Sequence, residues 1–338
     1  MKLKPAKIIF YLAMALILVA AAVFLLTDNS GEPDYSFDAD RSNYSSVEID
    51  KERPVKREII YYPANPAPGD FLILEAGPLH DENAGELPAE FILPFPGEIS
   101  EYYRAGNLLY VIIAIGFDTQ PDIYPVSLVI NTDHPDGDTL VTEITIVEKD
   151  FSFSRFRMPP DRTAGWTAAR LAEDREKLRL ARETTEPYPL WLQTFVLPLE
   201  GPVTSQFGAI RVINDNPPRR HTGIDIAADE GTPVVAPGRG IVRLADYLLA
   251  GGNSVIIDHG LGISSAYMHL HTIAVEEGQV INRGELIGTV GMTGYATGNH
   301  LHWEVNIGQT PVNPQQLLQN ELLWIAPAYA DAFISTDR

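Results

Sequence analysis

Cysteine is absent from the 338 residues of this chain. Its absence excludes disulfide bonds, thiolate metal ligands and cysteine nucleophiles together. It also excludes a lipid anchor attached to a cysteine behind an N-terminal apolar segment. Any metal site in this chain must therefore be built from histidine, aspartate or glutamate.

Positive charge is scarce as well. The chain has 25 Lys and Arg against 45 Asp and Glu, a formal net charge of -20. Beyond the extreme N-terminus, its only basic cluster is the pair Arg219 and Arg220. Because phosphate binding needs concentrated positive charge, this composition argues against nucleic acid as a partner. The length suffices for about two domains of ordinary size, each with its own core.

Lysine is missing from the whole chain after Lys177. This absence matters because "PVVAPGRGIVRLA" and "GQVINRGELIGTVG" share a rhythm of apolar strands around a glycine-containing turn. Lipoyl and biotinyl carrier domains have half-repeats of this kind, but they carry their cofactor on a lysine. The sequence therefore excludes a carrier function.

A single long hydrophobic run is present, from Ile8 to Leu26, and three lysines precede it. Nineteen residues at 1.5 Å rise approach the thickness of the hydrocarbon core, roughly 30 Å. The lysines before the run and the acidic residues after it predict a cytoplasmic N-terminus. We expect residues 1–27 to be a single-pass anchor in the cell membrane, with the rest extracytoplasmic. The alternative is a signal peptide cleaved near Ala20 to Ala22, which would give a secreted protein.

Four further segments follow from composition and periodicity, and the whole is predicted to be mostly β. Residues 28–53 are polar and acidic, as expected of a flexible linker. Residues 54–150 contain about seven short β-rich runs between turns, typical of an immunoglobulin-like β-sandwich whose partner the sequence leaves open. Residues 151–189 are a helical linker, with the helix expected over Ala164 to Glu186. Residues 190–338 combine glycine turns with short β runs, which predicts a compact antiparallel β domain.

Six of the eight histidines lie between His221 and His302. His221 and Asp225 are four residues apart, and His300 and His302 are two apart, so alternation places each pair on one face of a strand. "SAYMHLH" adds His269 on a third element. Zinc accepts imidazole and carboxylate ligands, and a catalytic zinc uses three of them and a water. These five residues suffice for three ligands and two catalytic groups, although spacing does not assign the roles.

Three stretches resemble the lysostaphin-type, or LytM-like, zinc metallopeptidases: "HTGIDIAADEGTPVVAPGRGIV", "NSVIIDHGLGISSAYMHL" and "GQVINRGELIGTVGMTGYATGNHLHWEV". The resemblance covers about Glu200 to Pro314 and includes the signature elements in order. It implies a duplicated-hybrid-motif β fold and cleavage of peptide bonds in bacterial peptidoglycan. Trp303, where the family often has phenylalanine, is expected only to enlarge the packed face behind the ligand.

The resemblance also implies roles for the five residues. One zinc ion would be held by His221, Asp225 and His302, and His269 and His300 would be the catalytic histidines. The leading hypothesis is thus a zinc metalloendopeptidase, membrane-anchored or exported, acting on peptidoglycan stem or cross-bridge peptides in cell-wall remodelling. The alternative is a non-catalytic peptidoglycan-binding regulator that activates another hydrolase; the presence of all five residues favours the enzyme.

Other polar residues near these motifs have weaker signals. We expect Tyr267, two residues before His269, to line the cleft and donate to an oxyanion. His271 is expected at the rim of the site or behind the ligands, and His259 in a hydrogen-bonding or packing role at a turn. Glu304 is expected to point away from the metal.

Overall fold

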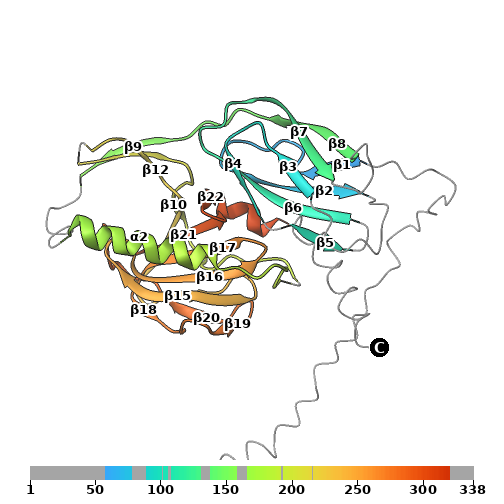
Figure 1. Ribbon diagram of the computed structural model, residues 1–338. Helices are drawn as coiled ribbons and strands as arrows, with labels where there is room; N and C mark the ends of the chain where they lie inside the picture. The colour runs from blue at the N-terminus through green and yellow to red at the C-terminus, as the bar shows by residue number, and fades with distance from the viewer. Residues whose placement is uncertain are drawn as a thin grey trace, which may run out of the picture. The chain divides into compact units, whose positions relative to one another are not determined.

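The computed structural model describes residues 58–319, except 78–88, 101, 106–107, 131–137, 158–165, 192 and 215 (Figure 1). The predicted anchor, residues 1–27, and the predicted linker, residues 28–53, lie outside the described residues. Among the residues that are described, no helix is both long enough and apolar enough to cross a membrane.

The described residues between Glu58 and Ile146 form two antiparallel sheets, so the predicted β character of this segment is confirmed. The first sheet consists of β1 (Glu58–Tyr62), β2 (Phe71–Gly77), β6 (Leu108–Ile115) and β4 (Gly97–Ile99), with β5 (Tyr103–Ala105) also paired to β6. The second consists of β3 (Ala89–Ile92), β7 (Asp122–Ile130) and β8 (Asp138–Ile146). The sequence pattern missed β4 and β5, because three residues are too few to show periodicity.

Strand β6 is buried on both faces, which explains its unbroken apolar sequence "LLYVIIAI". Val111, Ile113 and Ile115 pack in the core between the two N-terminal sheets. Ile112 and Ala114, on the opposite face, pack in the core of the C-terminal part. The first sheet therefore borders two cores.

The C-terminal part is built on an eight-stranded sheet, with every pair of neighbours antiparallel. In order it comprises β10 (Val203–Ser205), β13 (Gly223–Ala227), β21 (His300–Ile307), β17 (Ile263–Leu270), β16 (Gly252–Gly260), β15 (Gly240–Leu248) and β19 (Val280–Ile281), with β22 (Thr310–Val312) beside β21. A small sheet of β14 (Pro233–Val235), β20 (Leu286–Thr289) and β18 (Thr272–Ile273) and a 3-10 turn, η3 (Pro314–Leu318), complete it.

Helix α2 (Ala168–Glu183) lies across one face of the eight-stranded sheet (Figure 1). Its Ala181 is buried in a small cluster with Leu244, Ile256 and Ala266 of three neighbouring strands. The Thr167 hydroxyl caps the N-terminus by accepting a hydrogen bond from the Arg170 amide at 3.2 Å. The helix is shorter than the predicted Ala164 to Glu186, because its caps are Thr167 and Thr184.

The segment expected to be a helical linker also contributes a strand to a small three-stranded sheet. β9 (Phe153–Phe156) is a strand, and it pairs in parallel with β11 (Ile210–Ile213), which pairs with β12 (Arg219–Arg220). The segment predicted as a helical linker, residues 151–189, therefore contains a strand in addition to its helix, and the sequence did not indicate that strand. Four alternating residues are too few to indicate a strand without the partner that β11 supplies.

Candidate metal centre and catalytic site

Two adjacent strands bring three metal-binding side chains together. In the antiparallel pair β13 and β21, Asp225 lies directly opposite His302, and His221 comes just before β13. His221 Nε2 is 3.0 Å from Asp225 Oδ1 and 3.0 Å from His302 Nδ1, and these last two atoms are 2.9 Å apart. Zinc–ligand bonds of 2.0–2.2 Å in a tetrahedral site separate ligand atoms by about 3.3 Å. The triangle is thus close to the size that a zinc ion requires.

The hydrogen bonds around the triangle leave its centre without a proton donor. His221 Nδ1 lies 2.9 Å from the Gln206 carbonyl, which can only accept, so Nδ1 carries the hydrogen and Nε2 a lone pair. His302 Nε2 faces Glu304 Oε2 at 3.5 Å, which favours a hydrogen there and a lone pair on Nδ1. With Asp225 Oδ1, three lone-pair atoms converge, and a bound cation would stabilise that arrangement. The donor set therefore fits a divalent metal ion.

The electrostatics of the ligands fit the same conclusion. Burial would raise the pKa of Asp225, but its close contacts with His221 and His302 hold it well below its usual range in the metal-free site. Burial would lower the pKa of His302, but its contacts with Asp225 and Glu304 raise it to about 9. Without a metal, a proton on His302 would balance the carboxylates, so this part of the site requires positive charge.

Arg211 also contacts this group, although it was not among the residues predicted from the sequence. Its Nη2 lies 2.6 Å from Asp225 Oδ2, and the same atom donates to Ser205 Oγ. The guanidinium therefore orients the ligand carboxylate from the side opposite the triangle. The available signal was weak, because a single arginine in the apolar run "AIRVIN" does not indicate a partner 14 residues away.

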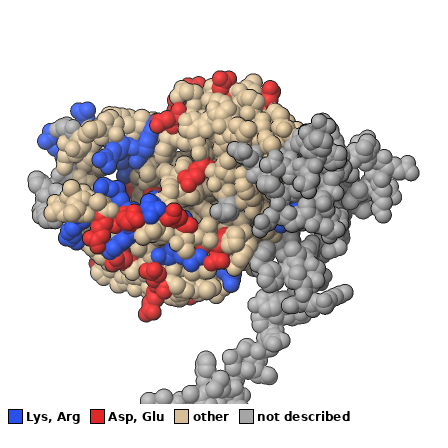
Figure 2. Space-filling model, in the orientation of Figure 1, with Lys and Arg blue, Asp and Glu red and all other residues tan. Residues whose placement is uncertain are grey.

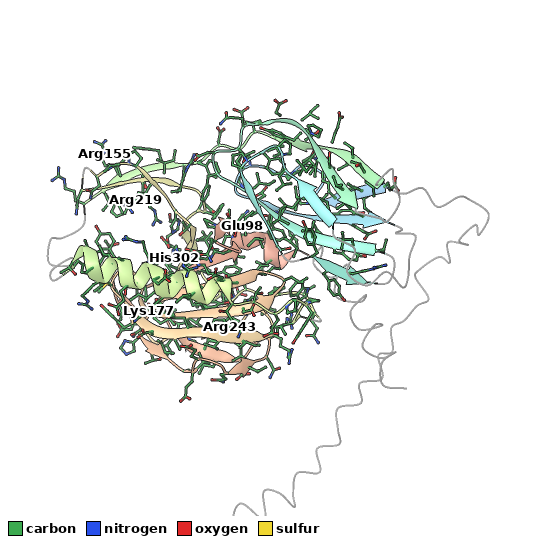
Figure 3. All side chains as sticks on the ribbon, in the orientation of Figure 1. Glu98, Arg155, Lys177, Arg219, Arg243 and His302 are labelled. Carbon is green, nitrogen blue, oxygen red and sulfur yellow. The ribbon has the colours of Figure 1, made fainter. Side chains whose placement is uncertain are left out.

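The two predicted catalytic histidines lie beside the triangle (Figure 3 labels His302). The His269 and His300 ring centroids are 4.8 Å apart. His269 Nδ1–H donates to the Thr293 carbonyl and His300 Nδ1–H to the Gly298 carbonyl, each at 2.8 Å. Each therefore has a lone pair on Nε2, and His300 Nε2 is 3.8 Å from Asp225 Oδ1. All five predicted residues are thus brought together, and both histidines can accept a proton.

His269 is held in an unusual state. Burial, together with the repulsion that His300 and His302 exert when charged, lowers its pKa to about 3, so it is uncharged at neutral pH. Its backbone is left-handed, with φ of 65°. A residue with a Cβ rarely adopts this conformation, and such residues concentrate at functional sites.

The expectation for Tyr267 was wrong. Tyr267 is fully buried in the large apolar core, and its hydroxyl lies 2.6 Å from Ser265 Oγ. The expectation relied on strand alternation between Tyr267 and His269, but the left-handed backbone at His269 interrupts that alternation. Only the His269 side chain therefore reaches the site.

The expectation for Glu304 was also wrong. His300, His302 and Glu304 alternate along β21, so all three lie on the same face, and Glu304 is buried directly behind His302. His271 instead lies at the surface, with Nδ1 3.8 Å from Glu230 Oε1 and about half of its side chain exposed. Of the two places expected for His271, the rim of the site and the position behind the ligands, the second is therefore occupied by Glu304.

His259 does form hydrogen bonds, as expected, but inside the protein. Its Nδ1–H donates to the Arg239 carbonyl at 2.9 Å, and its Nε2 accepts from Ser265 Oγ at 2.7 Å. It is 0% exposed, and burial lowers its pKa. Its role is structural.

We expect this histidine to reduce stability in acid. Unfolded His259 binds a proton near pH 6.5, whereas the folded state binds it only at lower pH, so unfolding is favoured as the pH falls below 6.5. The free energy of unfolding should be measured in urea at pH 7.5 and 5.5 for the wild type and for His259→Gln, both without metal. The wild type should be the more stable of the two at pH 7.5, and its advantage in free energy of unfolding should be about 1 kcal/mol smaller at pH 5.5. A difference independent of pH would contradict this assignment.

Comparison with known proteins points to the same region. Residues 219–314 match the family described as Peptidase family M23. The chain is 47% identical over 96 residues to the DD-carboxypeptidase/endopeptidase Mpg of Neisseria meningitidis serogroup B, a match covering 28% of this chain and 22% of that protein. It is 43% identical over 93 residues to the Peptidoglycan DD-endopeptidase ShyA of Vibrio cholerae, with the same coverage. The matching stretch thus spans about a fifth of the length of these relatives.

A solved structure is similar over a longer part of the chain. It is the crystal structure of a Pseudomonas aeruginosa protein assigned to peptidase M23, with 26% sequence identity and a TM-score of 0.53. The similarity covers 75% of this chain and 95% of that one. It therefore extends beyond the stretch that matches the family.

Proposed function

The C-terminal region of this chain, residues 219–314, belongs to peptidase family M23, and from this premise we propose that the protein is a zinc metalloendopeptidase that hydrolyses peptide bonds in peptidoglycan. One observation carries the proposal: three lone-pair ligand atoms converge within 3.0 Å of one another beside two histidines whose Nε2 atoms can accept a proton. The two relatives are named as a DD-carboxypeptidase/endopeptidase and a peptidoglycan DD-endopeptidase, so DD bonds in the crosslinks are the first substrates to test.

Within this proposal the residues have distinct roles. His221, Asp225 and His302 would hold one zinc ion. When bound, zinc supplies Lewis acidity, which lowers the pKa of a water molecule and polarises a carbonyl group. We assign the general base to His300, because its Nε2 is free to accept a proton and the Asp225 carboxylate at 3.8 Å would stabilise the imidazolium that forms.

His269 has a different task. Its low pKa keeps it uncharged, and the Thr293 carbonyl fixes its tautomer, so its Nε2 presents a fixed hydrogen-bond acceptor next to His300. Such an acceptor can orient the reacting water through one of its hydrogens while His300 takes the other. Arg211 holds the ligand carboxylate in place during this step.

The remaining expectations from the sequence are proposals of the same kind. We propose that residues 1–27 anchor the protein in the cell membrane with the catalytic part outside, where peptidoglycan peptides are found. The two sheets formed by β1 to β8, packed on a common core, support an immunoglobulin-like sandwich. The antiparallel C-terminal sheet supports the duplicated-hybrid-motif fold.

The test uses the full chain, loaded with zinc, on purified cell walls. We expect turbidity to fall and new amino termini to appear, a chelator to stop both, and added zinc to restore both. Mass spectrometry of the released fragments would identify the cleaved bond. Bound zinc without new amino termini would overturn the proposal and favour the regulator. Cleavage of simple soluble peptides with intact walls would overturn the assigned substrate.

A further inference from the structure

Glu304 is a buried carboxylate with donors on both oxygens. Its Oε1 accepts from Arg182 Nη2 at 2.5 Å and from Asn306 Nδ2 at 2.9 Å. Its Oε2 accepts from the Thr222 hydroxyl at 2.6 Å and faces His302 Nε2 at 3.5 Å. With donors on both oxygens and an arginine as partner, Glu304 is held as a fixed acceptor behind a metal-binding histidine.

The cation in this group comes from a distant part of the chain. Arg182 lies in the last turn of α2, 122 residues before Glu304, and outside the stretch that matches the peptidase family. The pair is enclosed, with 14% of the Arg182 side chain and 5% of the Glu304 side chain exposed. Because α2 crosses the face of the sheet that carries His302, its last turn lies within reach of the ligand's partner (Figures 1 and 3).

The contact has an energetic consequence. A buried carboxylate is unfavourable unless a cation and hydrogen bonds compensate for the water that it loses, so Glu304 without Arg182 would be driven to turn away from its position. That change alters its interaction with His302. Carboxylates that face the second nitrogen of a metal-bound histidine fix the ring and its tautomer, and losing one typically weakens metal binding by about 10- to 100-fold.

We propose that Arg182 is a positioning residue for the metal centre: by holding Glu304 it orients His302, so helix α2 is part of the metal site. The inference depends on the metal site of the proposed function but not on its substrate. It also predicts that the metal centre is incomplete without a helix that the family match does not include.

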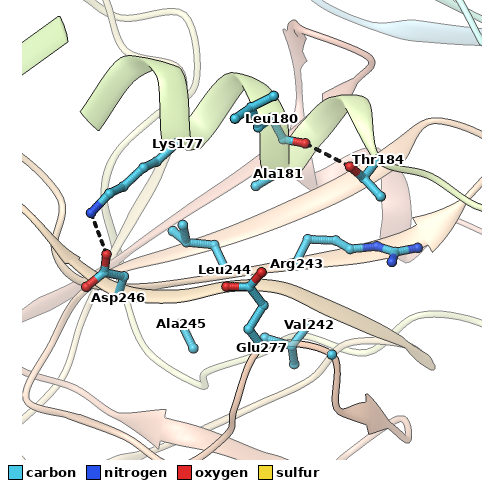
Figure 4. Close-up of a pocket in the computed structure, with 11 residues that line it drawn as sticks. Lys177, Leu180, Ala181, Thr184, Val242, Arg243, Leu244, Ala245, Asp246 and Glu277 are labelled. Carbon is cyan, nitrogen blue, oxygen red and sulfur yellow. Dashed lines mark hydrogen bonds and ion pairs between the residues drawn. The ribbon is translucent and has the colours of Figure 1, made fainter. Parts of the chain in front are cut away.

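Other contacts of α2 differ in kind and supply a matched control. Lys177 Nζ pairs with Asp246 Oδ2 at 2.7 Å, with 37% and 47% of the two side chains exposed. This pair borders a pocket between the helix and β15 (Figure 4), away from the predicted site residues. Arg179 pairs with Glu176 and Glu183 on the outer face of the helix, and charges of both signs are visible over α2 in Figure 2. Exposed pairs of this kind contribute little to stability.

The experiment compares Arg182→Met with Lys177→Met in the full chain. Each variant removes one positive charge from the same helix, but only the first removes the contact with Glu304. Zinc alone is the probe, and its dissociation constant is measured by competition with a chromophoric chelator. We expect Arg182→Met to weaken zinc binding by about 10- to 100-fold, Arg182→Lys to recover part of the loss, and Lys177→Met to bind within about twofold of wild type.

A double-mutant cycle tests the route through Glu304. If Arg182 acts through this carboxylate, Arg182→Met should add little to the loss caused by Glu304→Gln. The visible spectrum of the cobalt-substituted protein should change in Arg182→Met and Arg182→Lys but not in Lys177→Met. A purely structural role of Arg182 would not produce this difference between the spectra. Equal zinc affinity in Arg182→Met and Lys177→Met, or additive losses in the cycle, would overturn the inference. Zinc affinity that follows the expected pattern in a protein that leaves cell walls intact would overturn only the proposed function.

Discussion

Replacing Asp225 with alanine is expected to abolish zinc binding and peptidoglycan hydrolysis together. Asp225 Oδ1 is within 3.0 Å of both ligand nitrogens, and its Oδ2 receives Arg211. Without the carboxylate, two histidines and the positive charge of Arg211 remain, which is a poor site for a cation. Metal content of the purified variant and release of amino termini from cell walls are the measurements. Wall hydrolysis by the metal-free variant would contradict the assignment.

His300→Gln is the complementary change, and it should separate the two properties. His300 is not part of the ligand triangle, so zinc should remain bound, whereas loss of a general base should reduce hydrolysis by about 10²- to 10⁴-fold. His271→Gln is the matched control, because His271 is a surface histidine and its replacement should leave zinc content and rate unchanged. If His300→Gln released the metal, His300 would be a ligand rather than the base.

Gly260→Ala is expected to destabilise the protein far more than the same substitution at Gly278. Gly260 has φ of 84°, and a Cβ at this position would lie 2.0 Å from the Tyr188 carbonyl oxygen. That carbonyl belongs to the segment that follows α2, where the Leu190 amide donates to the His259 carbonyl at 2.9 Å. A methyl group would therefore force this segment away from the sheet. We expect a decrease of at least about 3 kcal/mol in the free energy of unfolding.

Gly278 provides the control for this substitution. It has the same φ of 84°, but a Cβ there would meet nothing within 4 Å. Gly278→Ala should therefore cost only the left-handed conformation, about 1–2 kcal/mol. Urea unfolding of both variants separates the cost of the left-handed backbone from the cost of the clash with Tyr188. Equal losses in free energy of unfolding would show that the close approach to Tyr188 does not matter.

The sequence predicted those parts of the site that depend on local alternation. Asp225, His300 and His302 lie on neighbouring strands where the period of two fixes their face. Tyr267 was misplaced because the left-handed backbone of His269, which the sequence does not reveal, interrupts this period. Glu304 needed no further information, since the same alternation places it beside His302.

Contacts between distant segments could not be predicted in the same way. Arg182 and Glu304 are 122 residues apart, and nothing in either local sequence indicates the other. β9 became recognisable only through its pairing with β11. The long apolar runs of β2 and β6, in contrast, were clear from composition because strands buried on two sides need no polar positions.

The burial of β6 on both faces has a consequence for how the protein unfolds. Its side chains point alternately into the two cores. If β6 left one core during unfolding, its apolar side chains in the other core would also become exposed. The Gln316 side chain ties the same sheet to the C-terminal part through the amide and carbonyl of Phe71, at 2.8 and 3.1 Å. Cooperative unfolding should therefore extend back at least to β2, so the folding unit is larger than the stretch that matches the peptidase family, residues 219–314.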